Sequence, residues 1–174
     1  MTRIGFIGVG TMGLPMAKNL VKKGFTVTAF DANPDAVNAA AAAGMTAAAS
    51  AAEAVATADL VVTMLPSSPH VEAVYTGDGG VLAAARKGTL CVDMSTIDPA
   101  VSQRVARAAQ ERGVRFMDAP VSGGTPRATD GTLAIMVGGT AADFEEAKPA
   151  LSAKGANVIH VGPAGRGEVA KLSN

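Results

Sequence analysis

The chain has 174 residues, enough for one domain with its own core, and 48% of them are hydrophobic although only 3% are aromatic. Fifteen basic residues balance fifteen acidic ones, so nothing in the charge pattern indicates a nucleic-acid or anionic-membrane partner. The single cysteine, Cys91, excludes an internal disulfide and fits a reducing cytoplasm, where we expect the protein to reside.

The first predicted elements form a strand-helix-strand unit. An apolar run over 4–9 predicts a strand, an amphipathic segment predicts a helix, and a second apolar run ends on Asp31. Because the chain starts with this strand, and no apolar run could cross a bilayer, we expect neither a signal peptide nor a membrane span. Between strand and helix stand Gly8, Gly10 and Gly13, at GxGxxG spacing.

Each glycine of this turn has a physical reason in a dinucleotide site. Gly8 permits a tight turn, Gly10 lets the backbone approach a pyrophosphate, and Gly13 lets the helix pack against the strand. The helix N-terminus offers free N–H groups and a partial positive charge to phosphates. Asp31 can accept hydrogen bonds from the adenosine ribose and would repel a 2′-phosphate, so the sequence predicts NAD rather than NADP.

The rest of the chain alternates predicted helices and strands. Asn33 with Pro34 indicates a helix start, and Ser50 with Glu53 indicates a capping box. The alternation predicts an α/β fold, a doubly wound and mostly parallel sheet of the Rossmann type. Helices are predicted at 35–43, after Ser50, and at 71–75, 81–86, 99–111 and 141–151; strands at 46–48, 59–65, 89–94, 114–119, 133–137 and 157–161; a loop or short helix at 123–131.

Five segments together resemble the β-hydroxyacid dehydrogenase family. They are GFIGVGTMGLPMAKNL (5–20), DMSTIDPAVS (93–102), DAPVSGG (118–124), GTLAIMVGG (131–139) and GRGEVAKLSN (165–174). The resemblance covers the whole chain and implies an NAD-binding Rossmann domain over 1–163. Residues 164–174 would begin an inter-domain helix, which in this family leads into a mostly helical second domain. Since the sequence stops at Asn174, we expect that second domain to be absent from it.

The resemblance also implies a role for individual residues. The pyrophosphate would lie on Gly8, Gly10, Thr11, Met12 and Gly13, the adenosine ribose on Asp31, the body of the cofactor along Leu65, Pro66 and His70, and the nicotinamide ribose near Thr96. The substrate carboxylate would be held by Ser122, Gly123 and Gly124. Lys171 matches the catalytic lysine, and Asn174, one helical turn further, could orient the substrate or the lysine.

The implied reaction is the oxidation of a short 3-hydroxy acid, with hydride transfer to NAD and Lys171 as general acid/base. For 3-hydroxyisobutyrate the product is methylmalonate semialdehyde, a step of valine degradation. One alternative is a reductase of tartronate semialdehyde (2-hydroxy-3-oxopropionate), glyoxylate or succinic semialdehyde. Another is an NAD-binding module without turnover. A full-length form is expected to be a homo-oligomer.

Several of these residues have simpler explanations. Outside DAPVSGG, Ser122 would be a loop hydroxyl, and Ser95 and Thr96 could merely cap the helix at 99–111. Most helical lysines are solvated, so only its spacing singles out Lys171. His160, inside an apolar strand, is interpreted as structural. No group of His, Cys and acidic residues has metal-ligand spacing, so the sequence predicts no metal.

Overall fold

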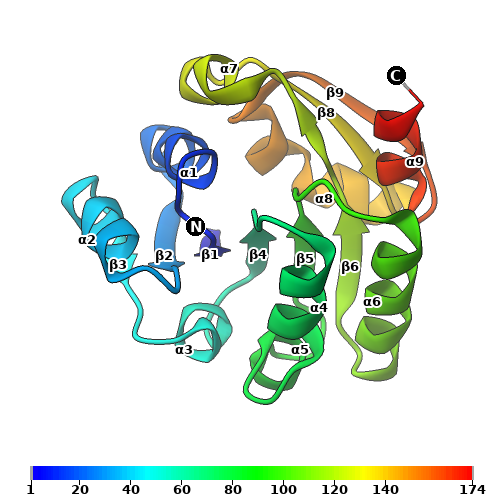
Figure 1. Ribbon diagram of the computed structural model, residues 1–174, viewed down its shortest axis with the longest axis horizontal. Helices are drawn as coiled ribbons and strands as arrows, with labels where there is room; N and C mark the ends of the chain where they lie inside the picture. The colour runs from blue at the N-terminus through cyan, green and yellow to red at the C-terminus, as the bar shows by residue number, and fades with distance from the viewer. Residues whose placement is uncertain (1, 174) are drawn as a thin grey trace.

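A single mixed sheet runs through residues 2–173, the part of the chain that the computed structural model describes. Its strands are β1 (Arg3–Ile7), β2 (Thr26–Phe30), β3 (Thr46–Ala47), β4 (Leu60–Thr63), β5 (Leu90–Asp93), β6 (Arg115–Asp118), β7 (Val121–Ser122), β8 (Leu133–Gly138) and β9 (Gly155–Gly162). Their order is β3-β2-β1-β4-β5-β6-β8-β7, with β9 paired to β8 (Figure 1). The strands from β3 to β6 are parallel, and β8 runs antiparallel to β6 and β7.

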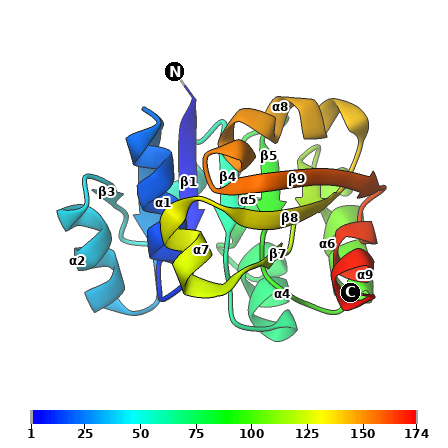
Figure 2. The same ribbon diagram turned by 90° about the horizontal axis from the view of Figure 1, so that it is seen from above.

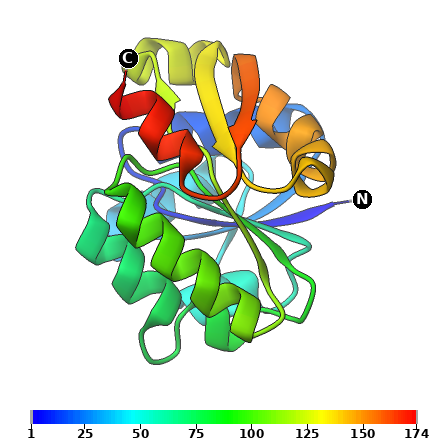
Figure 3. The same cartoon turned by 90° about the vertical axis from the view of Figure 1, so that its right-hand side faces the viewer.

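Helices cover both faces of this sheet. They are α1 (Gly13–Lys22), α2 (Pro34–Ala42), α3 (Ala51–Val55), α4 (Ser68–Thr76), α5 (Val81–Ala84), α6 (Pro99–Glu111), α7 (Gly124–Asp130), α8 (Ala141–Ser152) and α9 (Arg166–Leu172). In Figure 3 the green helices α4, α5 and α6 lie on one side of the sheet, and the blue α1 and orange α8 lie on the other. The predicted α/β class with a mostly parallel sheet is confirmed.

The two faces of the sheet carry two separate hydrophobic cores. In β1, Ile4 and Phe6 belong to the core under α1 and α8, whereas Ile7 belongs to the core under α3 to α6. The same alternation recurs in β4, where Val62 faces the first core and Val61 the second. Because successive strand residues point to opposite faces, a strand covered on both sides needs apolar residues throughout. This explains the uninterrupted apolar runs of the sequence.

Local capping signals place most helix starts where the sequence predicts them. The Asn33 side chain accepts the Asp35 N–H at 3.0 Å, and the Ser50 hydroxyl accepts the Glu53 N–H at 3.1 Å. Helix α6 is capped by Asp98, whose side chain accepts the Ala100 N–H, so the simpler explanation of Ser95 and Thr96 as its caps does not hold.

Helix α4 begins earlier than the predicted 71–75. It starts at Ser68, with Pro69 in its first turn, where the missing proline N–H costs no hydrogen bond. His70 therefore lies in the first turn of a helix.

The region after β6 departs from simple alternation. The segment predicted as a loop or short helix contains α7, which follows the short strand β7. The last strand is longer than the predicted 157–161, spanning Gly155–Gly162 parallel to β8. Figure 2 shows β8 and β9 side by side, with α7 near one end and α9 near the other. Asn174 lies outside the described residues, so its proposed role stays a prediction.

Candidate dinucleotide and substrate site

A cavity of about 520 Å³ opens where β1, β2 and β4 end. Strand order reverses here, since β1 lies between β2 and β4, and ligands of doubly wound sheets bind at such a switch point. The cavity is lined by every predicted cofactor residue except Thr96: Gly8, Gly10, Thr11, Met12, Gly13, Asp31, Leu65, Pro66 and His70. The structure thus brings the glycine turn together with residues as distant in sequence as His70.

The three glycines of the turn meet different surroundings. Gly8 has a φ of 97°, and a Cβ there would collide with the Met64 carbonyl. A Cβ on Gly13 would collide with the carbonyl of Gly8 itself. Around Gly10, in contrast, a Cβ would find no atom within 4 Å. Gly8 and Gly13 are therefore required by the fold, whereas Gly10 borders free space, as a residue that lets a pyrophosphate approach should.

The N-terminus of α1 points an electropositive end at this free space. Its N-cap, Met12, makes no side-chain capping hydrogen bond, and the first turn contains no acidic residue. The first N–H groups of a helix have no partner within the helix and carry partial positive charge. The turn and helix start together fit a pyrophosphate.

Asp31 ties the glycine turn to the end of β2. One carboxylate oxygen accepts the Val9 N–H at 3.0 Å, and the other accepts the Asn33 N–H at 2.9 Å. Each oxygen keeps a second lone pair, so the carboxylate can still accept hydroxyl groups of a ribose. These contacts hold the acid at the rim of the cavity.

The far side of the cavity is organised by Ser95 rather than by Thr96. Buried Ser95 accepts the Leu65 N–H at 2.8 Å and donates its hydroxyl to Asp93 at 2.6 Å. Thr96 is exposed and is not among the residues that line the cavity, so its proposed place near the nicotinamide ribose stays a prediction. His70 is exposed too, with Nδ1 2.6 Å from the Ser67 hydroxyl.

Lys171, the predicted catalytic lysine, lies against the segment predicted to bind the substrate. Lys171 Nζ, carried by α9, donates to the Ser122 hydroxyl at 3.2 Å and to the Val121 carbonyl oxygen. Gly123, with a φ of 135°, is the N-cap of α7, and Gly124, with a φ of 68°, is its first residue; both are exposed. An ammonium, a hydroxyl and accessible glycine backbone at one place can bind an anion and exchange a proton with a bound oxygen.

Two contacts join this group to the cofactor turn. The Thr125 hydroxyl lies 3.7 Å from Met12 Sδ, which links the start of α7 to the glycine turn. Near the other end of α7, buried Asn19 of α1 donates to the Ala128 carbonyl at 2.8 Å. Helix α7 is thereby held against α1, so the residues predicted for substrate and for pyrophosphate share one region.

Sequence reasoning missed a group of buried acids behind Lys171. Asp118 accepts N–H groups from the start of α9, and Glu168 accepts the Ile97 N–H at 3.0 Å. Burial raises the pKa of Glu168 to about 8, and burial also raises the pKa of Asp93 to about 6. An acid at the carboxyl end of strand β6 was a signal for Asp118, whereas Glu168 has no such signal.

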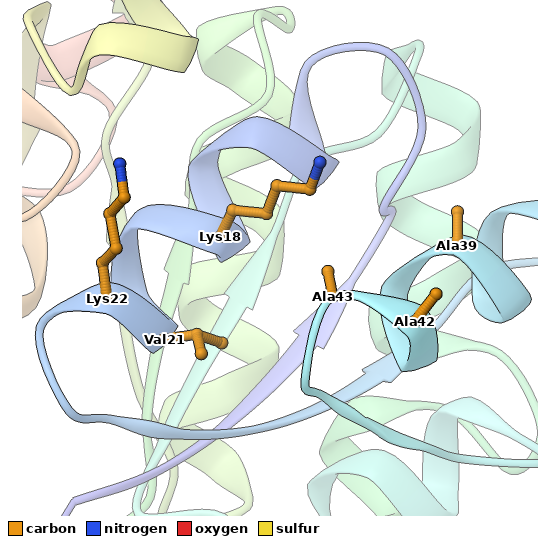
Figure 4. A pocket seen from close by; sticks show the side chains of 6 residues that line it. All are labelled: Lys18, Val21, Lys22, Ala39, Ala42 and Ala43. Atoms are coloured by element: carbon orange, nitrogen blue, oxygen red, sulfur yellow. The ribbon is translucent and has the colours of Figure 1, made fainter.

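Another cavity, of about 430 Å³, lies between α1 and α2 (Figure 4). It contains none of the predicted site residues, and is lined by Lys18, Val21, Lys22, Ala39, Ala42 and Ala43. Figure 4 shows the Lys18 side chain extending toward the helix of the alanines and the Lys22 side chain pointing elsewhere, so the two amines do not converge. Small apolar side chains with two solvated cations supply no group that would orient a ligand.

Residues 2–173 contain neither a cluster of metal ligands nor a helix suited to a bilayer. No group of three or more His, Cys, Asp or Glu in this range could hold a metal ion. Within the same range, no helix combines the length and the apolar character needed to cross a membrane. The two histidines have other surroundings, since His160 bonds the Gly139 carbonyl at 2.7 Å and stacks on Phe144.

Relatives are similar over nearly the whole chain. It is 50% identical over 174 residues to the NAD-dependent L-serine dehydrogenase of Pseudomonas aeruginosa, covering all of this chain and 58% of that protein. It is 46% identical over 173 residues to mitochondrial 3-hydroxyisobutyrate dehydrogenase of Mus musculus, and the match covers 99% of this chain and 52% of that protein. A solved structure of Mycobacterium tuberculosis 3-hydroxyisobutyrate dehydrogenase with L-serine superposes on this chain with a TM-score of 0.96 at 46% identity. The match covers 100% of this chain and 59% of that one.

The chain thus spans between 52% and 59% of the length of these three proteins. Residues 3–162 match the family described as the NAD binding domain of 6-phosphogluconate dehydrogenase. This range contains the glycine turn, Asp31 and the whole cofactor cavity. The chain therefore belongs to this family of NAD-binding domains.

Proposed function

We propose that this chain is the cofactor-binding part of an NAD-dependent dehydrogenase that oxidises a short 3-hydroxy acid. The observation that carries the proposal is the contact of Lys171 Nζ with the Ser122 hydroxyl at 3.2 Å, on a segment followed by Thr125, which contacts Met12 of the cavity lining. The similarity to hydroxyacid dehydrogenases supports the same reaction class.

In this proposal the glycine turn and Asp31 bind the cofactor. The backbone at Gly10 and the first turn of α1 receive the pyrophosphate, and Asp31 accepts the adenosine ribose hydroxyls. Bound NAD supplies the hydride acceptor of the reaction. Asp31 disfavours a 2′-phosphate, because its charge would stand beside a second anion.

The remaining residues handle the substrate. Ser122 and the N–H groups of Gly123 and Gly124 bind the substrate carboxylate. Uncharged Lys171 Nζ accepts the proton of the substrate hydroxyl as the carbon loses its hydride, and the ammonium returns this proton in the reverse direction. The Val121 carbonyl, which accepts from the same nitrogen, keeps Nζ oriented during the exchange.

The proposed substrate is 3-hydroxyisobutyrate, oxidised to methylmalonate semialdehyde in valine degradation. L-Serine is a second candidate, favoured by the name of the 50% identical Pseudomonas aeruginosa protein and by the ligand of the Mycobacterium tuberculosis structure. Both molecules are 3-hydroxypropionates that differ at carbon 2, which bears a methyl group in one and an ammonium in the other. The ratio of their kcat/KM values, measured with the matching aldehydes in reverse, decides between them.

The general acid/base role is tested with Lys171→Ala in the full-length polypeptide. We expect kcat to fall by a factor of roughly 10² to 10⁴, with an unchanged Kd for NAD. Lys148→Ala, an exposed lysine on helix α8, is the matched control and should keep normal turnover. Near-normal turnover of Lys171→Ala would refute the mechanism.

Calorimetric titration of the chain itself with NAD, with an activity assay on the same sample, tests whether residues 1–174 act as a binding module. Binding without turnover supports the module, and turnover excludes it. A homo-oligomer of the full-length form and a cytoplasmic location belong to the same proposal. Sedimentation analysis and cell fractionation test them.

A further inference from the structure

Asp118 stands at the end of β6, where its carboxylate is completely buried. One oxygen accepts the Gly165 N–H at 2.7 Å, and the other accepts the Glu168 N–H at 2.8 Å. The N-cap residue of α9 is Gly165, which has no side chain to offer. A side chain 47 residues away in sequence therefore satisfies the free N–H groups at the start of this helix.

Glycines permit the close approach of α9 to the sheet. Gly138 is the partner of Asp118 in the β6–β8 pairing, and a Cβ there would collide with the Asp118 carboxylate. A Cβ on Gly167 would lie 2.5 Å from the Met136 carbonyl oxygen and 2.8 Å from that of Asp118. The first turn of α9 thus lies directly on β6 and β8, without room for side chains between them.

The segment that holds the helix start also receives the lysine. Lys171 comes one turn after Gly167 and Glu168, and its ammonium contacts Val121 and Ser122. These two residues follow Asp118 by three and four positions. Segment 118–122 therefore binds both the backbone at the start of α9 and the side chain at its last turn.

We propose that Asp118 is a positioning residue for Lys171, whose carboxylate fixes the start of α9 so that the lysine Nζ stands at the Ser122 hydroxyl. The inference rests on the proposed function, in which Lys171 exchanges the proton of the substrate. Asp118 itself is buried behind α9 and does not line the cofactor cavity.

Glu168 adds a second tie between α9 and the rest of the site. Its Oε1 accepts the Ile97 N–H at 3.0 Å, which fastens the helix to the loop that follows β5. Its Oε2 is buried without a hydrogen-bond partner among residues 2–173. Burial, together with the charges of Asp93 and Asp118, raises the pKa of Glu168 to about 8, so the group is mostly uncharged at neutral pH. The Glu168 side chain therefore adds little negative charge beside the Asp118 carboxylate that caps the helix.

The test is Asp118→Asn in the full-length polypeptide. The amide keeps one oxygen acceptor but turns an NH₂ donor toward an N–H donor of α9, so one of the two caps is lost. A displacement of reacting groups by about 1 Å can cost on the order of a hundredfold in rate, so we expect kcat to fall between tenfold and a hundredfold. The Kd for NAD should stay within about twofold of the original, because the glycine turn is untouched.

The matched control removes a helix cap elsewhere. The Thr140 hydroxyl accepts the Asp143 N–H at 3.1 Å at the start of α8, so Thr140→Ala loses a cap of the same kind. We expect Thr140→Ala to lower the melting temperature and to leave kcat unchanged. If both variants lower kcat equally, Asp118 has only a structural role and the proposal is overturned.

A double variant separates positioning from general stability. In a Lys171→Ala background, Asp118→Asn should lower the residual rate by less than about twofold, because its effect acts through the absent amine. If the double variant instead loses kcat by the product of the two single losses, the two substitutions act independently and the inference is overturned. Full activity of Lys171→Ala alone would instead overturn the proposed function, whereas full activity of Asp118→Asn alone would overturn only the positioning role.

A second variant serves if Asp118→Asn does not fold. Gly167→Ala pushes α9 away from β6 and β8 by its new methyl group, without altering the carboxylate. The same fall in kcat with an unchanged Kd for NAD is expected, and normal kcat in this folded variant would contradict the inference.

Discussion

Gly10→Ala should separate cofactor binding from folding, because the three glycines of the turn serve different purposes. Gly10 is exposed, has no positive φ, and would present its new methyl group to space that no atom occupies within 4 Å. Alanine at such a position loses less backbone entropy on folding and stabilises by ~0.4–1 kcal/mol. For a domain of this size, that corresponds to a rise in melting temperature of about 1–4 °C.

The same methyl group occupies the space proposed for the pyrophosphate. We expect the Kd for NAD to rise at least tenfold, equivalent to about 1.4 kcal/mol. Gly13→Ala is the contrasting variant, because its methyl group collides with the Gly8 carbonyl inside the fold. Overpacking of this kind costs ~1–3 kcal/mol, so the melting temperature of Gly13→Ala should fall.

The assay is calorimetric titration of each variant with NAD, alongside thermal unfolding. Adenosine, which lacks the pyrophosphate, is the control ligand and should bind Gly10→Ala as well as it binds the original chain. A destabilised Gly10→Ala, or one that binds NAD with unchanged affinity, would refute the assignment of this space to the pyrophosphate.

Two further substitutions test the charges of the chain. Asp31→Asn should weaken NAD binding about tenfold and reduce the preference for NAD over NADP, since the charge facing the ribose is lost while the side-chain shape is kept. If calorimetry gives the same ratio of the Kd for NADP to the Kd for NAD in the variant and in the original chain, this prediction is wrong. Lys154 is buried without a partner for Nζ among residues 2–173, and burial lowers its pKa to about 7 from 10.5. The free-energy cost of burying the Lys154 ammonium is full below pH 7, where both the folded and the unfolded chain hold the proton. Between pH 7 and 10.5 only the unfolded chain still holds it, so the cost declines as the pH rises toward 10.5. Lys154→Met should therefore raise the melting temperature at pH 7 and flatten its rise between pH 7 and 10.5, unlike the exposed control Lys23→Met; parallel pH curves would contradict the burial argument.

The buried polar network beside the cofactor cavity explains why Ser95, and not its neighbour Thr96, faces the interior. Asp93 accepts the hydroxyls of Thr63 at 2.8 Å and Ser95 at 2.6 Å, and the Thr63 hydroxyl also lies 2.8 Å from that of buried Tyr75. Ser95 can then accept the Leu65 N–H. Adjacent residues of an extended segment point to opposite sides, so Thr96 faces solvent. Which of two neighbouring hydroxyls faces inward depended on β4 lying beside β5.

Many local elements of this protein, above all those of its first half, follow from the sequence alone. Glycine spacing, capping residues and apolar runs are patterns among residues only a few positions apart. These patterns predict the β1-α1-β2 unit, the helix caps at Asn33 and Ser50, and the strands that are buried on both faces. The cofactor residues of the first turn and Asp31 are therefore recognisable from local sequence, because one supersecondary unit contains them all.

The tertiary structure alone decided how distant segments close on one another. The antiparallel return of β8, the contact of Lys171 with Ser122 and the cap that Asp118 places on α9 join residues 20 to 50 positions apart. No local pattern encodes these contacts, because they depend on which strand ends are adjacent and on glycines that let backbones touch. The sequence thus determined the cofactor-binding unit, and only the packed fold brought the proposed acid/base lysine to the residues it would serve.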